Sequence, residues 1–192
     1  LINFHAESPA DGFSFLPHIS VHIPDGVAET GMAMGPEDGA DSLNLEHPTL
    51  LLDAETAEPI AHFVEIRVTG SPAFTLLALR PLFPLEPAHR YVVLLKNLQT
   101  PEGDVIKVPE GFRSLRDDEA GADEPISNLR DRYQTEIFSV VDSAGVSRKD
   151  LLLAWDFTTR TEENVMADAL AMRSDAMAIF EANPPEVEII SV

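Results

Sequence analysis

The chain of 192 residues contains no cysteine. This absence excludes a disulfide scaffold, a thiolate zinc site and a cysteine nucleophile. It does not exclude export, because a domain of this length can bury enough apolar surface to fold without cross-links. The sequence also lacks an uncharged apolar run of about 18 residues, the length that a membrane-spanning helix requires. We therefore expect no insertion into a membrane.

Positive charge is scarce as well. The sequence has 13 basic residues against 33 acidic ones, a formal net charge of −20. Only Lys96, Lys107 and Lys149 are lysines. Nucleic-acid binding depends on Lys and Arg that neutralise phosphates, so such a surface repels polyanions, and it repels anionic membranes for the same reason. Nucleic acid is therefore not an expected partner, and most acidic residues are expected to form a solvated coat.

Motifs for catalysis are also missing. No Gly-x-Ser-x-Gly sequence occurs, and the closest segment, Asp11 to Phe15, lacks the second glycine. His18 and His22 are four residues apart, which on a strand separates them by about 13 Å, too far to share one metal ion. We therefore predict no catalytic and no cofactor-binding residue, and we do not expect this chain to be an enzyme by itself.

Neither end of the sequence resembles a natural terminus. Leu1 is not an initiator methionine, and no basic region followed by an apolar stretch marks a signal peptide. The last residues, 188–192, have the pattern of a strand. We interpret the chain as a piece cut from a longer protein.

Short apolar runs broken by proline and glycine fill most of the chain. They predict strands at 19–23, 49–52, 63–68, 74–79, 91–95, 105–108 and 151–158. The runs at 74–79 and 91–95 are almost wholly apolar, which is typical of strands that are buried on both faces or central in a sandwich. Strands that recur at this spacing, with turn residues between them, favour a mainly β protein with a β-sandwich over a βαβ fold.

Two segments have helical periodicity. Apolar residues recur at three- and four-residue steps over about 126–144, where Gly145 is placed to end a helix. The second helix is expected over about 161–182, with Thr159 and Glu162 as a capping box and Asn183-Pro184-Pro185 as its end. We expect a sandwich with a helical insertion over 1–160. A connector helix and a first strand, 161–192, would lead to a downstream domain.

Acidic clusters raise the question of a bound cation. Glu37, Asp38 and Asp41 lie in the glycine-containing segment 35–42, which lacks the twelve-residue spacing of an EF-hand loop. A solvated loop is the favoured interpretation, and the same holds for 116–124. The three residues stay weak calcium candidates, and no other cofactor is expected. Trp155, in an apolar run, is interpreted as a core residue rather than a ligand-stacking ring.

Several segments together resemble a known family. They are Ser8-Pro9-Ala10-Asp11-Gly12, the run from Leu79 to Val93, Asn97 to Gly103, and Trp155-Asp156-Phe157-Thr158-Thr159. Their order and spacing resemble bacterial Ig-like domains of the S-layer (SbsA) type. The resemblance covers about residues 7 to 160, with 116–150 as an extra element, and it implies an Ig-like β-sandwich.

A closer likeness is to the N-terminal region of large exported bacterial lipase- or esterase-like proteins. In these proteins the strand ending in Trp-Asp-Phe-Thr-Thr precedes a helix with a Met-Arg-x-Asp-Ala run, here Met172 to Ala176. The resemblance implies a non-catalytic accessory domain that packs on a downstream α/β-hydrolase domain, with any catalytic serine beyond Val192. It also implies an extracellular, cell-surface or periplasmic location in a bacterium. The alternative is an extracellular binding or adhesion module, with calcium as the candidate stabilising ion.

Overall fold

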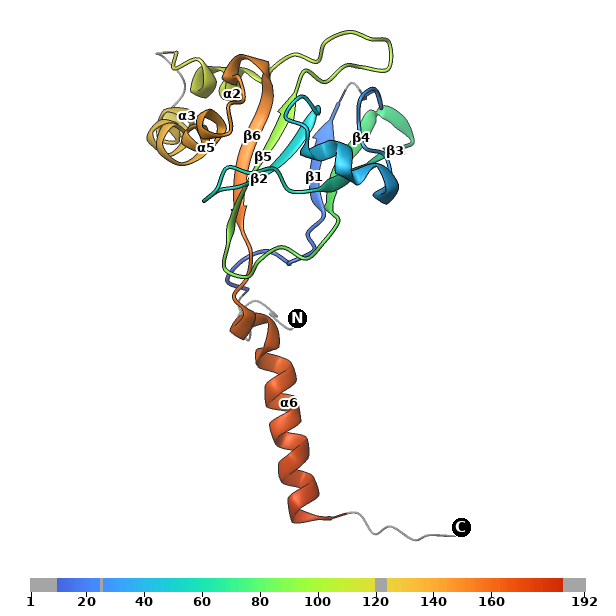
Figure 1. The fold of residues 1–192 in the computed structure, drawn as a ribbon, viewed down its shortest axis with the longest axis vertical. Coiled ribbons are helices and arrows are strands. Elements are labelled where there is room, and N and C mark those ends of the chain that lie inside the picture. Colours follow the sequence, from blue (N-terminus) through green and yellow to red (C-terminus); the bar gives the residue numbers. More distant parts are fainter. Residues whose placement is uncertain (1–9, 25, 120–123, 185–192) are drawn as a thin grey trace.

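The strands of this protein form two antiparallel sheets of three strands each (Figure 1). The computed structural model describes residues 10–24, 26–119 and 124–184. We call the sheet with the order β1-β4-β3 sheet I and the sheet with the order β2-β5-β6 sheet II. Sheet I consists of β1 (Ile19–Ile23), β3 (His62–Thr69) and β4 (Ser71–Pro81), and sheet II of β2 (Thr49–Asp53), β5 (Arg90–Lys96) and β6 (Leu151–Thr158).

Six of the seven strands predicted within the described residues are confirmed, and the strand expected at 188–192 lies outside those residues. The prediction of a strand at 105–108 is wrong. Val105 forms only an isolated bridge with Gln99, and the N–H of Ile106 donates to the oxygen of Leu98 at 2.9 Å. The short turn after β5 therefore folds back without adding a strand to sheet II.

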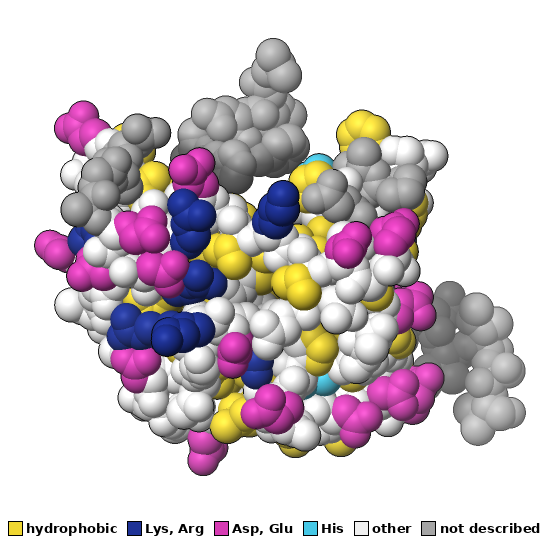
Figure 2. Space-filling view, turned by 90° about the horizontal axis from the view of Figure 1, so that it is seen from above, with side chains coloured by type: hydrophobic (Ala, Val, Ile, Leu, Met, Phe, Trp, Pro, Cys, Tyr) yellow, Lys and Arg dark blue, Asp and Glu magenta, His cyan; other side chains and the backbone are white. Residues whose placement is uncertain are grey.

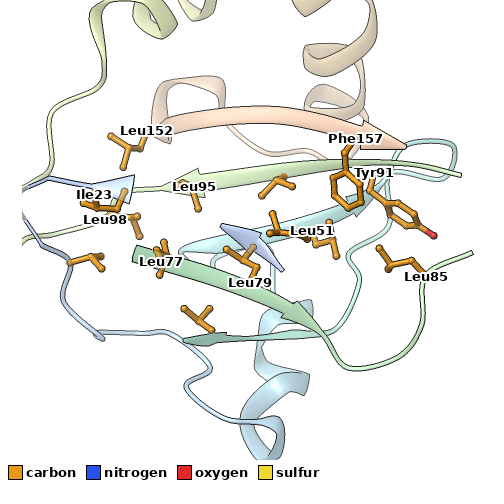
Figure 3. Packing of buried hydrophobic residues seen from close by; sticks show 14 residues of the cluster. Ile23, Leu51, Leu77, Leu79, Leu85, Tyr91, Leu95, Leu98, Leu152 and Phe157 are labelled. Atoms are coloured by element: carbon orange, nitrogen blue, oxygen red, sulfur yellow. The ribbon is translucent and has the colours of Figure 1, made fainter. Parts of the chain in front are cut away.

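Sheets I and II pack face to face around an apolar core (Figure 3). Leu77 and Leu79 of β4 lie in one cluster with Leu51 of β2 and Leu95 of β5, and all four are fully buried. Alternate residues of each strand contribute to this cluster because side chains alternate between the two faces of a strand.

The other face of sheet II is covered by short helices that connect β5 to β6. They are α2 (Glu110–Arg116), α3 (Glu124–Ser127), α4 (Arg130–Arg132), the π-helical turn η2 (Tyr133–Ile137), α5 (Phe138–Ser143) and the short turn η3 (Arg148–Asp150). Ile137 and Phe138 pack there with Leu50 and Leu94 in a second buried cluster. Sheet II is thus buried on both faces, which explains why β2 and β5 are continuous apolar runs.

This helical layer corrects the predicted fold class. Helices account for 35% of the residues and strands for 26%, so the protein is mixed and not mainly β. The helix expected over 126–144 is present as α3 and, after a two-residue turn, as one continuous helical stretch from Arg130 to Ser143 in which η2 is a π-helical segment, whereas α2 has no counterpart in the prediction. The hydroxyls of Thr135, Ser139 and Ser143 donate to carbonyl oxygens four residues earlier, a contact that bends helices. Gly145, with a φ of 75°, ends the series as predicted.

The helical layer also holds half of the arginines, and they are paired with acids. Figure 2 shows Lys and Arg side chains gathered among Asp and Glu side chains on the side where these helices lie. Arg132 donates to both carboxylate oxygens of Asp156, at 2.6 and 2.8 Å, and Arg148 donates to Asp142 at 2.9 Å. These arginines connect the helical layer to sheet II and connect helices within the layer. They do not form a free anion-binding surface.

The outer face of sheet I is more exposed than that of sheet II in the part of the chain that the structure describes. Phe74 and Leu76 of β4 are exposed there, although Ala78 on the same face is buried. The run 74–79 is therefore not buried on both faces along its whole length, but β4 is the central strand of its sheet, as the second alternative predicts. At the side where β2 and β3 lie, the 3₁₀ helix η1 (Pro36–Leu43) packs on the sandwich. The segment predicted as a solvated loop is therefore helical, with proline in its first turn.

Candidate functional site

The C-terminal helix α6 (Glu162–Ala182) extends away from the sandwich (Figure 1). Its bounds confirm the predicted helix over 161–182, including the end at Asn183. No residue of α6 is buried. Seven large apolar side chains of α6 are each 40–70% exposed: Val165, Met166, Leu170, Met172, Met177, Ile179 and Phe180.

These apolar side chains occupy about half of the helix circumference at 3.6 residues per turn. The other half carries the alanines at 167, 171, 178 and 182, with acidic residues at both borders. The helix contains five acidic residues and one basic residue, Arg173, so α6 carries a net charge of −4. A helix that exposes this much apolar surface is normally covered in the assembled protein. Among the described residues, no helix is long and apolar enough to cross a membrane.

The first turn of α6 is fixed by Thr161. Its Oγ1 accepts the N–H of Asn164 at 3.1 Å, which makes Thr161 the N-cap. Thr161 also donates from Oγ1 to Asp11 Oδ2 at 2.7 Å, and its N–H donates to Asp11 Oδ1 at 3.2 Å. The hydrogen bond from the Thr161 side chain lowers the pKa of the Asp11 carboxyl below its ordinary value.

The predicted capping box on Thr159 is wrong. Thr159 is buried, its Oγ1 donates to the oxygen of Glu86 at 2.5 Å, and it accepts the N–H of His89 at 3.0 Å. Phe13 lies on the other side of this segment, where its N–H donates to the oxygen of Thr158 and its oxygen accepts the N–H of Arg160. The connection between β6 and α6 is thus held on both sides by backbone of the sandwich.

Gly12 allows this close approach of the two segments. A Cβ on Gly12 would lie 2.6 Å from the carbonyl carbon and oxygen of Thr159, closer than side-chain atoms normally come to backbone. Only glycine fits at this point without moving one of the two backbones. In the sequence, Asp11 and Gly12 belong to the family-like segment and to the incomplete Gly-x-Ser-x-Gly motif, and neither pattern pairs them with the helix.

An apolar groove of about 530 Å³ lies at the base of α6. Phe13, Leu16, Pro84 and Val165 line it, together with Arg160. Phe13 and Leu16 are more than half exposed. The groove therefore continues the apolar surface of α6 onto the end of the sandwich.

A smaller cleft of about 190 Å³ lies between β1 and β6. His18, Trp155 and Phe157 are among the residues that line it. Trp155 is partly buried and packs against the main core, as the sequence indicates, but it also borders this cleft. A role as a ligand-stacking ring stays untested.

The weak calcium candidates do not form a ligand set together with other residues. Glu37, Asp38 and Asp41 lie on η1 and are exposed. In the described parts of the chain, no three or more His, Asp and Glu side chains converge as metal ligands would. Calcium binding at these residues therefore stays an open prediction.

The pair that most resembles catalytic machinery is Asp53 and His89. His89 Nε2 lies 2.8 Å from Asp53 Oδ2, and Nδ1 lies 3.9 Å from Glu55 Oε1. Desolvation raises the pKa of Asp53, but hydrogen bonds from the N–H groups of Thr56 and Glu55 and the nearby His89 outweigh it and lower that pKa. Because both ring nitrogens face carboxylates, the ring is not placed to activate a hydroxyl nucleophile.

Comparison with models of known protein families gives no match to this chain. A search of curated proteins finds no significant similarity either. The resemblance to S-layer-type Ig-like domains and to exported lipase-like proteins therefore stays a prediction, and the function is argued from the geometry.

Proposed function

We propose that this chain is a non-catalytic accessory module that docks through α6 onto a hydrolase domain of the lipase or esterase kind in the same exported bacterial protein. The observation that carries the proposal is the exposure of α6, which presents seven large apolar side chains to solvent while burying none of its residues. An exposed apolar surface of this kind is typical of a protein-protein contact.

The chemistry of α6 restricts what can cover it. The helix carries a net charge of −4, so a second copy of α6 would bring like charges together. A complementary surface is an apolar channel with basic residues at its borders. The groove at Phe13 and Leu16 extends the contact onto the sandwich, so that the docked domain would touch both parts.

The geometry around Tyr91 supports an Ig-like sandwich. Tyr91 lies at the start of β5, and its hydroxyl accepts the N–H of Glu86 at 2.9 Å, five residues earlier. Ig-like domains use the same contact, the tyrosine corner, to fix the connection that enters a strand. In this protein the corner holds the proline-rich connection that follows β4.

The test uses the full-length gene product and two double variants with equal charge changes. Leu170→Glu with Ile179→Glu places charge on α6, and Phe74→Glu with Leu76→Glu places it on the outer face of sheet I. We expect the α6 variant to separate the thermal unfolding of the module from that of the hydrolase domain and to lower ester hydrolysis. The sheet variant should behave as wild type.

Two results would overturn the proposal. The first is hydrolysis of short- and medium-chain acyl esters by the 192-residue chain alone. The second is an α6 variant whose unfolding and activity match those of wild type. If the long product is inactive and the chain gains thermal stability with added calcium, the binding-module alternative replaces the proposal, because a ligand of the folded state stabilises by mass action.

A further inference from the structure

A buried chain of hydrogen bonds lies where β2 and β3 meet η1. His47 Nε2 accepts the N–H of Ala33 at 2.9 Å, so the proton of this neutral ring sits on Nδ1. Nδ1 lies 2.7 Å from the oxygen of Thr49, to which it donates. The ring of His47 thereby fixes the segment before η1 to the first residue of β2.

His62, the first residue of β3, continues the chain. Its Nδ1 donates to the oxygen of Ile60 at 2.9 Å, and its Nε2 accepts the hydroxyl of Thr49 at 2.8 Å. The N–H of His62 donates to Ser42 Oγ at 2.8 Å, and that hydroxyl donates to the oxygen of Gly39 at 2.7 Å. His62 thus joins sheet I to sheet II and both to η1.

Only neutral rings satisfy this arrangement. If His47 Nε2 carried a proton, it would face the N–H of Ala33, and two donors cannot form a hydrogen bond with each other. His62 has no exposed surface, and the ring centroids are 5.7 Å apart, so two imidazolium ions would repel each other in the interior. The charged groups facing the rings are Asp41 on η1, which favours protonation of His47, and Lys96 on β5, which opposes it.

We propose that His47, Thr49 and His62 form an acid-sensitive latch, in which proton uptake by the rings releases η1 and the segment at Ala33 from β2 and β3 while the two sheets stay packed. The latch is independent of the docking function of α6. It can open locally because no residue of η1 belongs to the apolar cluster that joins the two sheets, and Met32 and Met34 beside Ala33 are only partly buried against that cluster.

The direction of the pH effect follows from the pKa of the rings. Burial lowers the pKa of His62 from 6.5 to about 4, and burial also lowers the pKa of His47. The latch is therefore fully closed above pH 6.5 and weakens as the pH falls from 6.5 toward 4. Over this range, each proton taken up on opening raises the ratio of open to closed molecules about tenfold per pH unit.

Amide hydrogen exchange of the intact chain between pH 7.5 and 4.5 tests the latch. After correction for intrinsic exchange, protection of the Ala33 and His62 amides should fall, below pH 6.5, about tenfold per pH unit for each ring that takes up a proton. Protection of the Val93 and Leu94 amides in β5 should not follow. Protection at Ala33 that does not change with pH overturns the proposal, and so does its loss in the same step as that of β5.

The variant His62→Gln keeps a donor and an acceptor but does not titrate, so it should reduce the pH dependence at Ala33 to the part that His47 contributes. The matched control is His18→Gln at an exposed ring, which should leave the dependence as in wild type. If His62→Gln does not fold, the NMR chemical shifts of the ring nitrogens in the wild-type chain test the proposal instead. Both rings carrying hydrogen on Nδ1 at pH 7.5, with His62 titrating near pH 4, support the latch. Titration of His62 near 6.5 in the folded chain overturns it.

Discussion

Asp11 and Thr161 are 150 residues apart in the sequence, yet the carboxylate of Asp11 accepts both the side-chain and the backbone hydrogen of Thr161. The same Thr161 hydroxyl accepts the N–H of Asn164 and so begins α6. The segment before β1 therefore fixes the position at which the last helix starts. This contact links the sandwich to the proposed docking helix.

Replacing Thr161 with alanine should unravel the start of α6. The loss of an N-cap side chain costs about 1 kcal/mol, and α6 has no buried residue to compensate for it. Far-ultraviolet circular dichroism should show less helix while the thermal midpoint of the sandwich changes little. The control is Thr135→Ala, which removes a hydroxyl bonded within a helix rather than a cap. Unchanged helicity in Thr161→Ala would contradict this role.

Gly12→Ala should destabilise the sandwich itself. The added methyl group would lie 2.6 Å from the backbone of Thr159, so the two segments must separate, at a cost of about 1–3 kcal/mol. Chemical denaturation measures the loss. The control is Gly111→Ala, in which the new methyl group would meet only the flexible end of Ile126, at 3.0 Å. An equally large loss of stability in this control would show that the effect is not specific to Gly12.

Removal of α6 after Asn164 should leave the stability of the sandwich unchanged. The truncation keeps the N-cap and its partners but deletes residues that are exposed throughout, and such changes stay within about 0.5 kcal/mol. Calorimetry of the two chains measures the difference. A clear fall in the thermal midpoint would mean that α6 packs on the sandwich in solution.

Phe138→Ala should cost about 3–5 kcal/mol, because this fully buried ring joins the helical layer to sheet II. The guanidinium of Arg148 lies 4.6 Å from the ring centroid and would lose this partner too. Phe83→Ala, at a largely exposed ring, should cost less than about 0.5 kcal/mol. Equal losses in both variants, measured by urea unfolding, would argue against a second core.

The strands were predictable because their apolar runs are local signals. The burial of β5 on both faces and the end of α6 at Asn183 could be read from neighbouring residues. The helical layer was predicted only in part, since the π-helical segment η2 depends on the fit of Ile137 and Phe138 to sheet II and α2 lies outside the predicted helix. A regular periodicity over 126–144 does not contain that information.

Contacts between distant segments could not be predicted at all. Asp11 accepts hydrogen bonds from the N-cap residue Thr161, 150 residues away, and His62 bonds Ser42 of η1 and Thr49 of the other sheet. Neither pairing leaves a pattern in the sequence, because each depends on where the chain returns after several turns. The exposure of the outer face of sheet I could not be predicted for a related reason. An apolar run does not indicate which face of the strand packs against a neighbouring element.

The direct passage from β6 into α6 has a mechanical consequence. Only Thr159, Arg160 and Thr161 separate strand and helix, and all three are held by backbone or side-chain bonds to the sandwich. At 1.5 Å per residue, α6 is a lever about 30 Å long. A force applied along α6 pulls β6 along the direction of the strand. The hydrogen bonds between β5 and β6 then resist this force together, in shear, rather than opening one after another. The helix is thereby attached to the sandwich at a point that resists tension.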